Sequence, residues 1–227
     1  MPLSWLSGIP SPRPDRLWGM VQIPDQRPFP DAVFDGQDLD LDGYRFEATD
    51  FTGAHAEGRT FLECTLVGCD LTESVLHSSR WSECVWERVV GAGVSLAEAT
   101  LQDVRIEQSR LGAVSAWGSH WRGVTVKGGK IDFLNLRGAT LKNVTFEDCT
   151  VIELDLQEAT VETVRFAGCR LVEPQFGRGR YKGLDLSGAE LVSPRGVAGL
   201  RGARVSRLQL LDLGPVLAAE AGIDVAD

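Results

Sequence analysis

The chain has 227 residues, of which 43% are hydrophobic, and it carries a formal net charge of −9. The length allows one domain with short extensions, and the negative charge argues against direct binding to nucleic acid or to an anionic membrane. No apolar run reaches the roughly 18 residues of a membrane-spanning helix. The N-terminus also lacks the basic and then apolar segments of a secretory signal. We therefore expect a soluble cytoplasmic protein.

Residues 1–30 are predicted to form an arm without regular structure. They hold seven of the ten prolines, with Trp5 and Trp18 between them, and proline removes the backbone donor that helices and sheets need. The arm is either flexible or docks on the rest of the protein or on a partner through its tryptophans. We favour docking, because exposed tryptophan is uncommon in a plain linker. Val33 and Phe34 are expected to plug the first coil.

Residues 31–196 are dominated by a period of five. Every fifth residue from Leu41 to Leu191 is apolar or small, and Gly91 is the only glycine in the series. This period fits neither a 3.6-residue helix nor a two-residue strand. It indicates a chain that turns a corner every five residues, which is a solenoid that stacks its coils around a buried core.

A second series lies two residues before the first and holds mostly small side chains, which we expect to point inward. All five cysteines belong to it: Cys64, Cys69, Cys84, Cys149 and Cys169. Cys64 and Cys84 are twenty residues apart and should stack, as should Cys149 and Cys169. We predict buried reduced thiols rather than disulfides, and no zinc site. Glycines recur two residues after the large apolar residue, where a type II turn requires positive φ.

This pattern resembles the pentapeptide repeat family, whose loose motif is Ala-(Asp/Asn)-Leu-X-X. The resemblance covers roughly residues 37–193 and is clearest in Cys69–Thr72, Leu184–Gly188 and Ala189–Leu191. It implies an all-β fold, a right-handed quadrilateral parallel β-helix with four five-residue faces in each coil. The segment is long enough for about seven and a half such coils.

Residues 197–227 are expected to form a short helical cap or a dimerisation module. Pro194 blocks strand pairing, and a shifted series follows with Leu200, Val205 and Leu210. Ser206 is predicted to cap a helix that runs to Leu213, Pro215 to open a second helix, and Gly222 to close it. Leu208, Leu211, Val216, Leu217 and Ile223 would supply an apolar face.

An outward apolar column suggests what this module contacts. The helices either fold back over the column within one chain or join two chains in a homodimer, and the sequence favours neither. The residues assigned to this dimer or cap contact are Phe133, Ile152, Val172, Val192, Leu208, Leu211 and Leu217.

No catalytic or cofactor-binding pattern is present, so we expect a protein that is not an enzyme and needs no cofactor. His55, His77 and His120 fall on different coils or faces, which makes a metal site improbable. The glycines follow the corner rule and do not form a phosphate-binding loop. Neither a nucleophile elbow nor a Cys/His pair can be assembled.

The charge is unevenly distributed along the chain. From Asp31 to Val104 there are 15 acidic and four basic residues, whereas from Arg105 to Gly196 there are 11 acidic and 13 basic residues. The acidic stretch has nearly the linear charge density of duplex DNA, about one charge per 1.7 Å. The carboxylates assigned to partner binding are Asp40, Asp42, Glu47, Asp50, Glu63, Asp70, Glu73, Glu83, Glu87, Asp103 and Glu107.

The resemblance adds a partner to this acidic surface. Acidic bacterial pentapeptide repeat proteins include fluoroquinolone-resistance and topoisomerase-poison resistance proteins, which bind DNA gyrase in the place of DNA. This chain has no break in register and so is similar to the loop-free members, although its repeats from Arg105 onward are not acidic. The alternatives are that acidity serves solubility alone, or that the chain is a scaffold whose partner binds the apolar column or the tryptophan arm.

Overall fold

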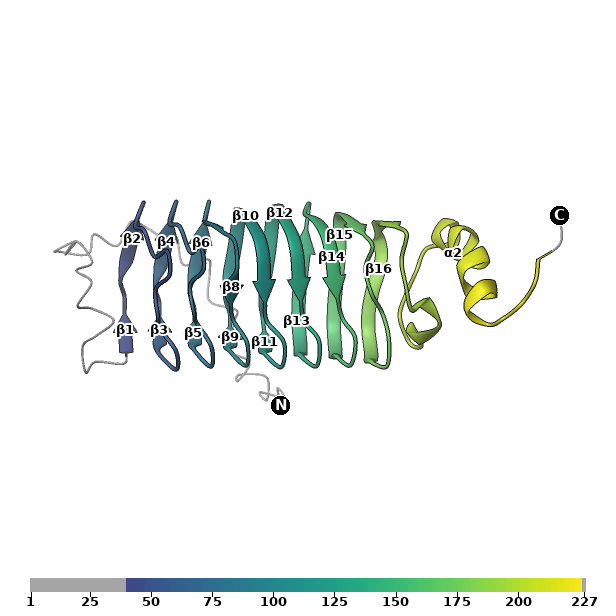
Figure 1. The fold of residues 1–227 in the computed structure, drawn as a ribbon, viewed down its shortest axis with the longest axis horizontal. Helices are drawn as coiled ribbons and strands as arrows, with labels where there is room; N and C mark the ends of the chain where they lie inside the picture. Colours follow the sequence, from purple (N-terminus) through teal and green to yellow (C-terminus); the bar gives the residue numbers. More distant parts are fainter. Residues whose placement is uncertain (1–39, 226–227) are drawn as a thin grey trace, which may run out of the picture.

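The computed structural model describes residues 40–225. The arm predicted over residues 1–30 and the plug predicted at Val33 and Phe34 lie outside the described residues and stay predictions. The described chain forms a rod of about eight stacked coils, with one helix at its C-terminal end (Figure 1).

Short strands form the sides of the rod, and longer ones run round its corners. In chain order the elements are β1 (Asp40–Asp42), β2 (Arg45–Glu47), β3 (Thr60–Leu62), β4 (Thr65–Val67), β5 (Arg80–Ser82), β6 (Val85–Glu87), β7 (Val90–Gly91), β8 (Val94–Ser95), β9 (Thr100–Gln102), β10 (Arg105–Ser115), β11 (His120–Arg122), β12 (Thr125–Asn135), β13 (Thr140–Glu147), β14 (Thr150–Asp155), β15 (Thr160–Val172), β16 (Arg180–Val192), the 3-10 helix η1 (Val197–Gly199) and α2 (Arg207–Glu220).

Neighbouring coils pair in parallel with an offset of twenty residues, as in β1 against β3 and β2 against β4. Each coil therefore has four sides of five residues. We call them the first, second, third and fourth sides, centred on Leu41, Phe46, Phe51 and Ala56 and on the residues that follow each of these at intervals of twenty.

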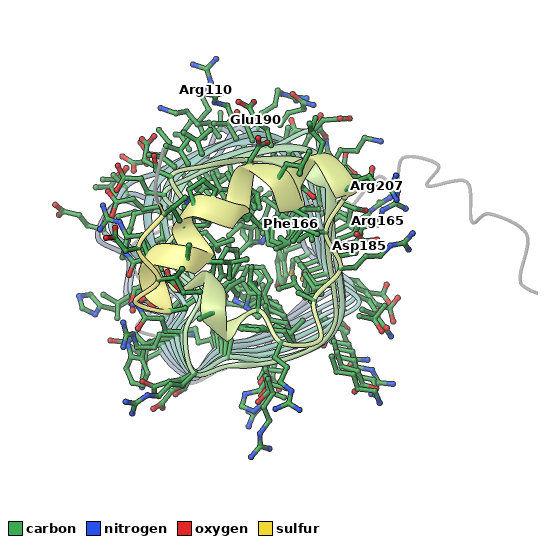
Figure 2. The ribbon with its side chains drawn as sticks, turned by 90° about the vertical axis from the view of Figure 1, so that its right-hand side faces the viewer. Arg110, Arg165, Phe166, Asp185, Glu190 and Arg207 are labelled. Carbon is green, nitrogen blue, oxygen red and sulfur yellow. The ribbon has the colours of Figure 1, made fainter. Side chains whose placement is uncertain are left out.

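Seen along its axis, the rod has a square outline (Figure 2). In that view the chain passes from Asp185 on the right to Glu190 at the top while it advances toward the viewer, which makes the coil right-handed.

The residues at the centres of the sides fill the interior. Leu66, Trp86 and Ile106, consecutive on the second side, are 2%, 0% and 4% exposed. On the first side the rings of Phe61 and Trp81 stack with centroids 3.7 Å apart. Parallel in-register pairing places equivalent side chains directly above one another, so the period of five becomes columns of buried apolar groups. The predicted solenoid is confirmed.

The space that Gly91 leaves in the stack is filled by two neighbouring side chains. A Cβ at this position would lie 2.9 Å from Cγ2 of Val94 and 3.3 Å from Cβ of Leu71. Val94, which replaces the small residue usual at its inward position, makes the nearest approach, and both other nearest atoms belong to Leu71.

The corners have positive φ, as expected, but glycine is not their only residue. Gly43 has φ of 68°, whereas Glu63, Glu83 and Asp103 adopt 51°, 54° and 53°. A left-handed backbone is costly for residues that carry a Cβ. The coils therefore hold acidic residues at corners where glycine would be easier to accommodate.

The five cysteines are buried and free, as predicted. The Cys64 and Cys84 thiols donate to the carbonyl oxygens of Leu41 and Phe61, each at 3.3 Å. The neighbouring Cys84 thiol, together with burial, raises the pKa of Cys64. Burial likewise raises the pKa of Cys69, which disfavours the reactive thiolate form.

The prediction of two terminal helices is wrong. A single helix, α2, runs from Arg207 to Glu220 with Pro215 inside it. Proline at this position removes one backbone hydrogen bond of the helix. Packing of the helix on the last coil keeps the helix continuous nonetheless. Both predicted ends are correct, because Ser206 forms a capping box with Gln209 and Gly222 adopts φ of 71° just after the helix.

The predicted apolar face of this helix is also largely wrong. Leu208 and Leu211 are both 69% exposed and Ile223 is 60% exposed, whereas Leu213 is buried and Val216 and Leu217 pack partly against the core. Leu200 and Val205 of the shifted series do pack on the core, but Leu210 is 53% exposed.

A polar residue makes the closest contact between α2 and the last coil. Nε2 of Gln209 donates to the carbonyl oxygens of Leu186 and Ala189 at 2.8 and 2.6 Å. The Glu220 carboxylate accepts hydrogen bonds from the backbone N–H groups of Gly196, Val197 and Ala198. The helix thus covers the open end of the rod (Figures 1 and 2) rather than the outward column on the third side.

Candidate partner-binding surface

The eleven predicted partner-binding carboxylates lie on the first four coils but do not form one patch. Their positions in the register place them on three sides and two corners. Asp40 and Asp42 lie on the first side, Glu63, Glu83 and Asp103 on the corner after it, Glu47, Glu87 and Glu107 on the second side, Asp50 and Asp70 on the third, and Glu73 on the corner after that.

The corner between the first and second sides is the most regular of these groups. We call Glu63, Glu83 and Asp103 the acidic ridge. All three are exposed, and none forms an ion pair among the residues that the structure describes. Their backbone N–H groups donate to the next coil, to the carbonyls of Ser82, Gln102 and Arg122. Successive carboxylates therefore follow the coil spacing of about 4.8 Å.

Glu83 and Asp103 of the ridge border a surface hollow of about 350 Å³. Glu83, Cys84, Val85, Asp103 and Arg105 line it. Two carboxylates and one guanidinium group line this hollow, so it suits a polar or charged side chain of a partner better than an apolar ligand.

The next coil leaves room for the last carboxylate of the ridge. A Cβ on Gly123 would collide with Oδ1 of Asp103, so that the glycine leaves room for this carboxylate.

Other carboxylates of the group are already partnered. Arg45 Nε lies 2.6 Å from Glu47, and Arg88 pairs with Glu87. Asp50 Oδ1 accepts from the backbone N–H of Thr52 at 2.9 Å, and hydrogen bonding to Thr52 lowers the pKa of Asp50. These three acids are less available to a partner than the ridge is.

Like charges face each other across coils in both halves of the rod. The acidic pairs are Asp50–Asp70 and Glu87–Glu107, and the basic pairs, farther along the chain, are Arg110–Lys130 and Arg122–Lys142. The second half also has ion pairs between coils: Lys127 with Glu147 at 3.4 Å, Lys142 with Glu162 at 3.1 Å, and Arg170 with Glu190. Like charges directly opposite each other destabilise a sheet, so the surface charge of both halves has a cost in stability.

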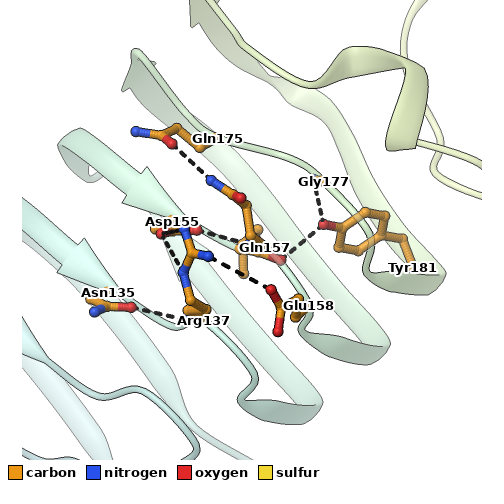
Figure 3. A network of polar contacts seen from close by, with 9 residues as sticks. Asn135, Arg137, Asp155, Gln157, Glu158, Gln175, Gly177 and Tyr181 are labelled. Carbon is orange, nitrogen blue, oxygen red and sulfur yellow. Dashed lines mark hydrogen bonds and ion pairs between the residues drawn. The ribbon is translucent and has the colours of Figure 1, made fainter.

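A polar network on the surface of the second half of the rod has a structural role. The guanidinium group of Arg137 donates to Asp155 at 3.0 and 3.2 Å, and Gln157 donates to Gln175 across the next coil (Figure 3). Opposite charges and matched amides satisfy one another here, which leaves no demand for an external ligand.

The residues of the predicted dimer or cap contact fall into two groups. Phe133 is 36% exposed, and Ile152, Val172 and Val192 are half-buried on or near the third side. Leu208 and Leu211 project from the outer face of α2, whereas Leu217 packs partly on the core. The structure does not bring these two groups together, since α2 lies across the end of the rod.

The histidines are placed on the surface, as expected. His55 lies 3.1 Å from Glu57, and His77 lies 3.4 Å from Glu98. Trp117, which the sequence analysis did not single out, is 42% exposed with its ring centroid 6.2 Å from that of His77. Its exposure could have been predicted from the sequence, because it directly follows the buried Ala116, where the register requires an outward side chain.

Within residues 40–225 no group of three or more His, Cys, Asp or Glu side chains could hold a metal ion. No helix in the same span is long and apolar enough to cross a membrane.

The geometry of the chain itself classifies it, because it has five residues on each side, four sides in each coil and parallel pairing throughout. The fold is that of a pentapeptide-repeat β-helix.

No protein-family model matches the sequence, and no curated protein matches it either. Among solved structures it is similar to full-length QnrB1, a plasmid-mediated fluoroquinolone resistance protein, at 16% identity and a TM-score of 0.39, over 78% of this chain and 99% of that one. It is also similar to HetL, a pentapeptide repeat protein involved in heterocyst differentiation regulation in Nostoc sp. strain PCC 7120, at 14% identity and a TM-score of 0.22, over 76% and 91%. At these identities the likeness concerns the fold alone.

Proposed function

We propose that this β-helix belongs with the acidic pentapeptide repeat proteins and acts without catalysis, binding DNA gyrase or a related type II topoisomerase in place of DNA. The first four coils would enter the basic DNA-binding groove of the enzyme. This would modulate the enzyme or protect it from fluoroquinolones and other topoisomerase poisons.

The main support for this proposal is the negative charge of the acidic coils that the structure describes. From Asp40 to Val104 there are twelve acidic and four basic residues, a net charge of −8. These 65 residues make about three and a quarter coils, or roughly 16 Å of rod, over which duplex DNA carries about nine charges. The carboxylates wrap round three sides, which fits a groove that encloses a rod better than a flat interface.

Supercoiling by purified gyrase, with and without a quinolone, tests the proposal. The chain should inhibit supercoiling or relieve the inhibition of gyrase by the quinolone. Its effect should weaken as the salt concentration rises, because salt screens electrostatic association. The variant Glu63→Gln/Glu83→Gln/Asp103→Asn should lose most of this effect. The matched control Asp132→Asn/Asp148→Asn/Glu153→Gln removes the same charge from exposed positions in the second half and should retain it.

Absence of any effect on gyrase at micromolar protein and low salt would end the proposal. If the two variants affected gyrase equally, only the net charge of the chain would matter. That result would favour the interpretation that acidity serves solubility.

The exposed outer face of α2 favours a second assignment, a homodimer. Leu208, Leu210 and Leu211 are 53–69% exposed on one short helix, and a second copy would cover them. Analytical ultracentrifugation should give a dimer that Leu208→Glu/Leu211→Glu converts to a monomer. A wild-type chain that is monomeric at high micromolar concentration would refute this assignment.

A further inference from the structure

The C-terminal end of the rod carries a group of cations that the net charge conceals. Arg180 and Lys182 lie on the first side in β16, Arg178 lies at the corner that precedes them, and Arg201 lies on the next turn of the chain. We call these four residues the basic end surface. All four are exposed, and none forms an ion pair among the described residues.

The contacts of neighbouring residues place Arg201 at the same end of the rod as the other three. Leu200 packs on the core, and Arg204 bridges to Asp185 on the preceding coil. Gly202 lies against the same coil, since a Cβ there would be 3.2 Å from the Tyr181 carbonyl oxygen. Arg201 directly precedes Gly202 in a turn, so it lies at the end of the rod next to the coil that carries Tyr181. Arg180 and Lys182, at alternate positions of β16, are about 6.6 Å apart along the strand.

The backbone that carries these cations is fixed from inside. The Tyr181 hydroxyl donates to the Leu156 carbonyl at 2.8 Å and accepts from the Gly177 N–H at 3.2 Å (Figure 3). A Cβ on Gly179 would collide with the Tyr181 ring. The segment between the glycines is therefore held in place, which lowers the entropic cost of binding.

The chemistry of this surface fits phosphate. Three of its four cations are guanidinium groups, which form bidentate hydrogen bonds with phosphate oxygens. Glycines flank them and let a ligand backbone approach closely. None of the large exposed apolar side chains of the described chain belongs to this surface. A stable protein interface usually needs such an anchor at its centre, so an acidic protein surface fits less well.

Nearby acids reduce this charge only in part. Arg204 and Arg195 are engaged with Asp185 and Glu173 at 3.8 and 2.7 Å. Glu162 lies directly opposite Lys182, but it forms its ion pair with Lys142 at 3.1 Å. Glu158, twenty residues before Arg178, pairs with Arg137 at 3.7 Å. The acidic ridge ends at Asp103, four coils away, or roughly 19 Å, which is about twice the Debye length at 0.1 M salt. Repulsion from that half is therefore largely screened at the basic end surface.

We propose that the basic end surface binds the phosphate backbone of duplex DNA, without reading its sequence. The net charge of −9 predicted no direct contact with nucleic acid, but the local charge at this end is of the opposite sign. The inference goes beyond the proposed function and does not depend on it, since no topoisomerase takes part.

Fluorescence anisotropy of a labelled 24-bp duplex with the full chain tests this surface. Four phosphate contacts give a slope of about −3.6 in log affinity against log salt, a loss of roughly 150-fold between 50 and 200 mM. A duplex of another sequence should bind equally well. Arg180→Gln/Lys182→Gln/Arg201→Gln should reduce the slope by about 2.7.

The control variant Arg45→Gln/Arg80→Gln/Arg110→Gln removes three exposed arginines elsewhere and should bind like the wild type, with circular dichroism confirming that both variants fold. Three outcomes would overturn the proposal: no binding at 20 mM salt, equal loss in both variants, or competition by poly-glutamate as strong as that by unlabelled duplex. The last would assign the surface to an acidic protein segment.

Discussion

Replacing Gly91 with alanine tests whether Val94 fills the space that this glycine leaves in the core. Gly91 does not have positive φ, so its backbone accepts alanine without strain. The new Cβ would lie 2.9 Å from Val94 Cγ2 and 3.2 Å from the carbonyl carbon of Leu71. The Val94 side chain must therefore shift, which is costly because a β-branched side chain has few rotamers, and the Leu71 backbone cannot easily move.

Overpacking of this kind costs about 1–3 kcal/mol, against which alanine gains about 0.5–1 kcal/mol over glycine in a strand. We expect Gly91→Ala to lower the free energy of unfolding by about 1–2 kcal/mol. Val94→Ala removes two methyl groups, a loss of about 1.6 kcal/mol in transfer free energy before any cavity effect. In the double variant the new methyl group occupies part of the space that Val94 vacates. The loss in free energy of unfolding of the double variant should therefore be about 1 kcal/mol smaller than the sum of the two single losses.

Urea titrations of the four proteins of this cycle, followed by tryptophan fluorescence, supply the measurement. A second cycle that combines Gly91→Ala with Val144→Ala, more than two coils along the chain, should be additive. If the Gly91–Val94 cycle were additive as well, or if Gly91→Ala stabilised the chain, the packing account of Gly91 would be wrong.

Three further outcomes concern the second half of the chain. Gln209→Ala leaves the Leu186 and Ala189 carbonyls without their donor and should cost about 1–3 kcal/mol in a urea titration; an unchanged midpoint would mean that water replaces the amide at no cost. Pro215→Ala restores a helix donor and should raise the thermal midpoint, whereas a lower midpoint would show that the ring itself contributes to packing. Hydrogen bonding to Ser187 lowers the pKa of Asp185 from its usual 3.8, so this carboxylate stabilises the fold above about pH 4 and loses the effect as the pH falls. The stability difference between wild type and Asp185→Asn should therefore shrink from pH 7 to pH 3, and a growing difference would contradict the reasoning.

The sequence predicts the coils well because one physical pattern repeats in them. Leu66, Trp86 and Ile106 had to be buried together once the period of five was recognised, and parallel pairing then placed Glu63 above Glu83. The carboxylate columns follow from the same register. That they would wrap round three sides instead of forming a patch also follows from counting residues, but only when each residue is assigned to its side.

The end of the rod was harder to predict because no repeat constrains it there. Pro215 inside α2 violates a local rule, and only the packing of the whole helix on the last coil explains it. Gln209, a polar residue, makes the closest contact, whereas Leu208 and Leu211 face solvent. Hydrophobicity alone therefore selected the wrong face, because the last coil presents carbonyl groups as well as apolar side chains.

The square cross-section links the length of the chain to the direction in which its charges point. An insertion of twenty residues between Val104 and Arg105 would move the two halves about 4.8 Å apart and leave both orientations intact. An insertion of only five residues would rotate everything after it by a quarter turn. Arg180 and Lys182 would then face a different way from Asp40 and Asp42, with which they now share the first side. Five-residue insertions and deletions are therefore the changes by which a lineage of such rods could alter the angle between two bound partners without redesigning either contact.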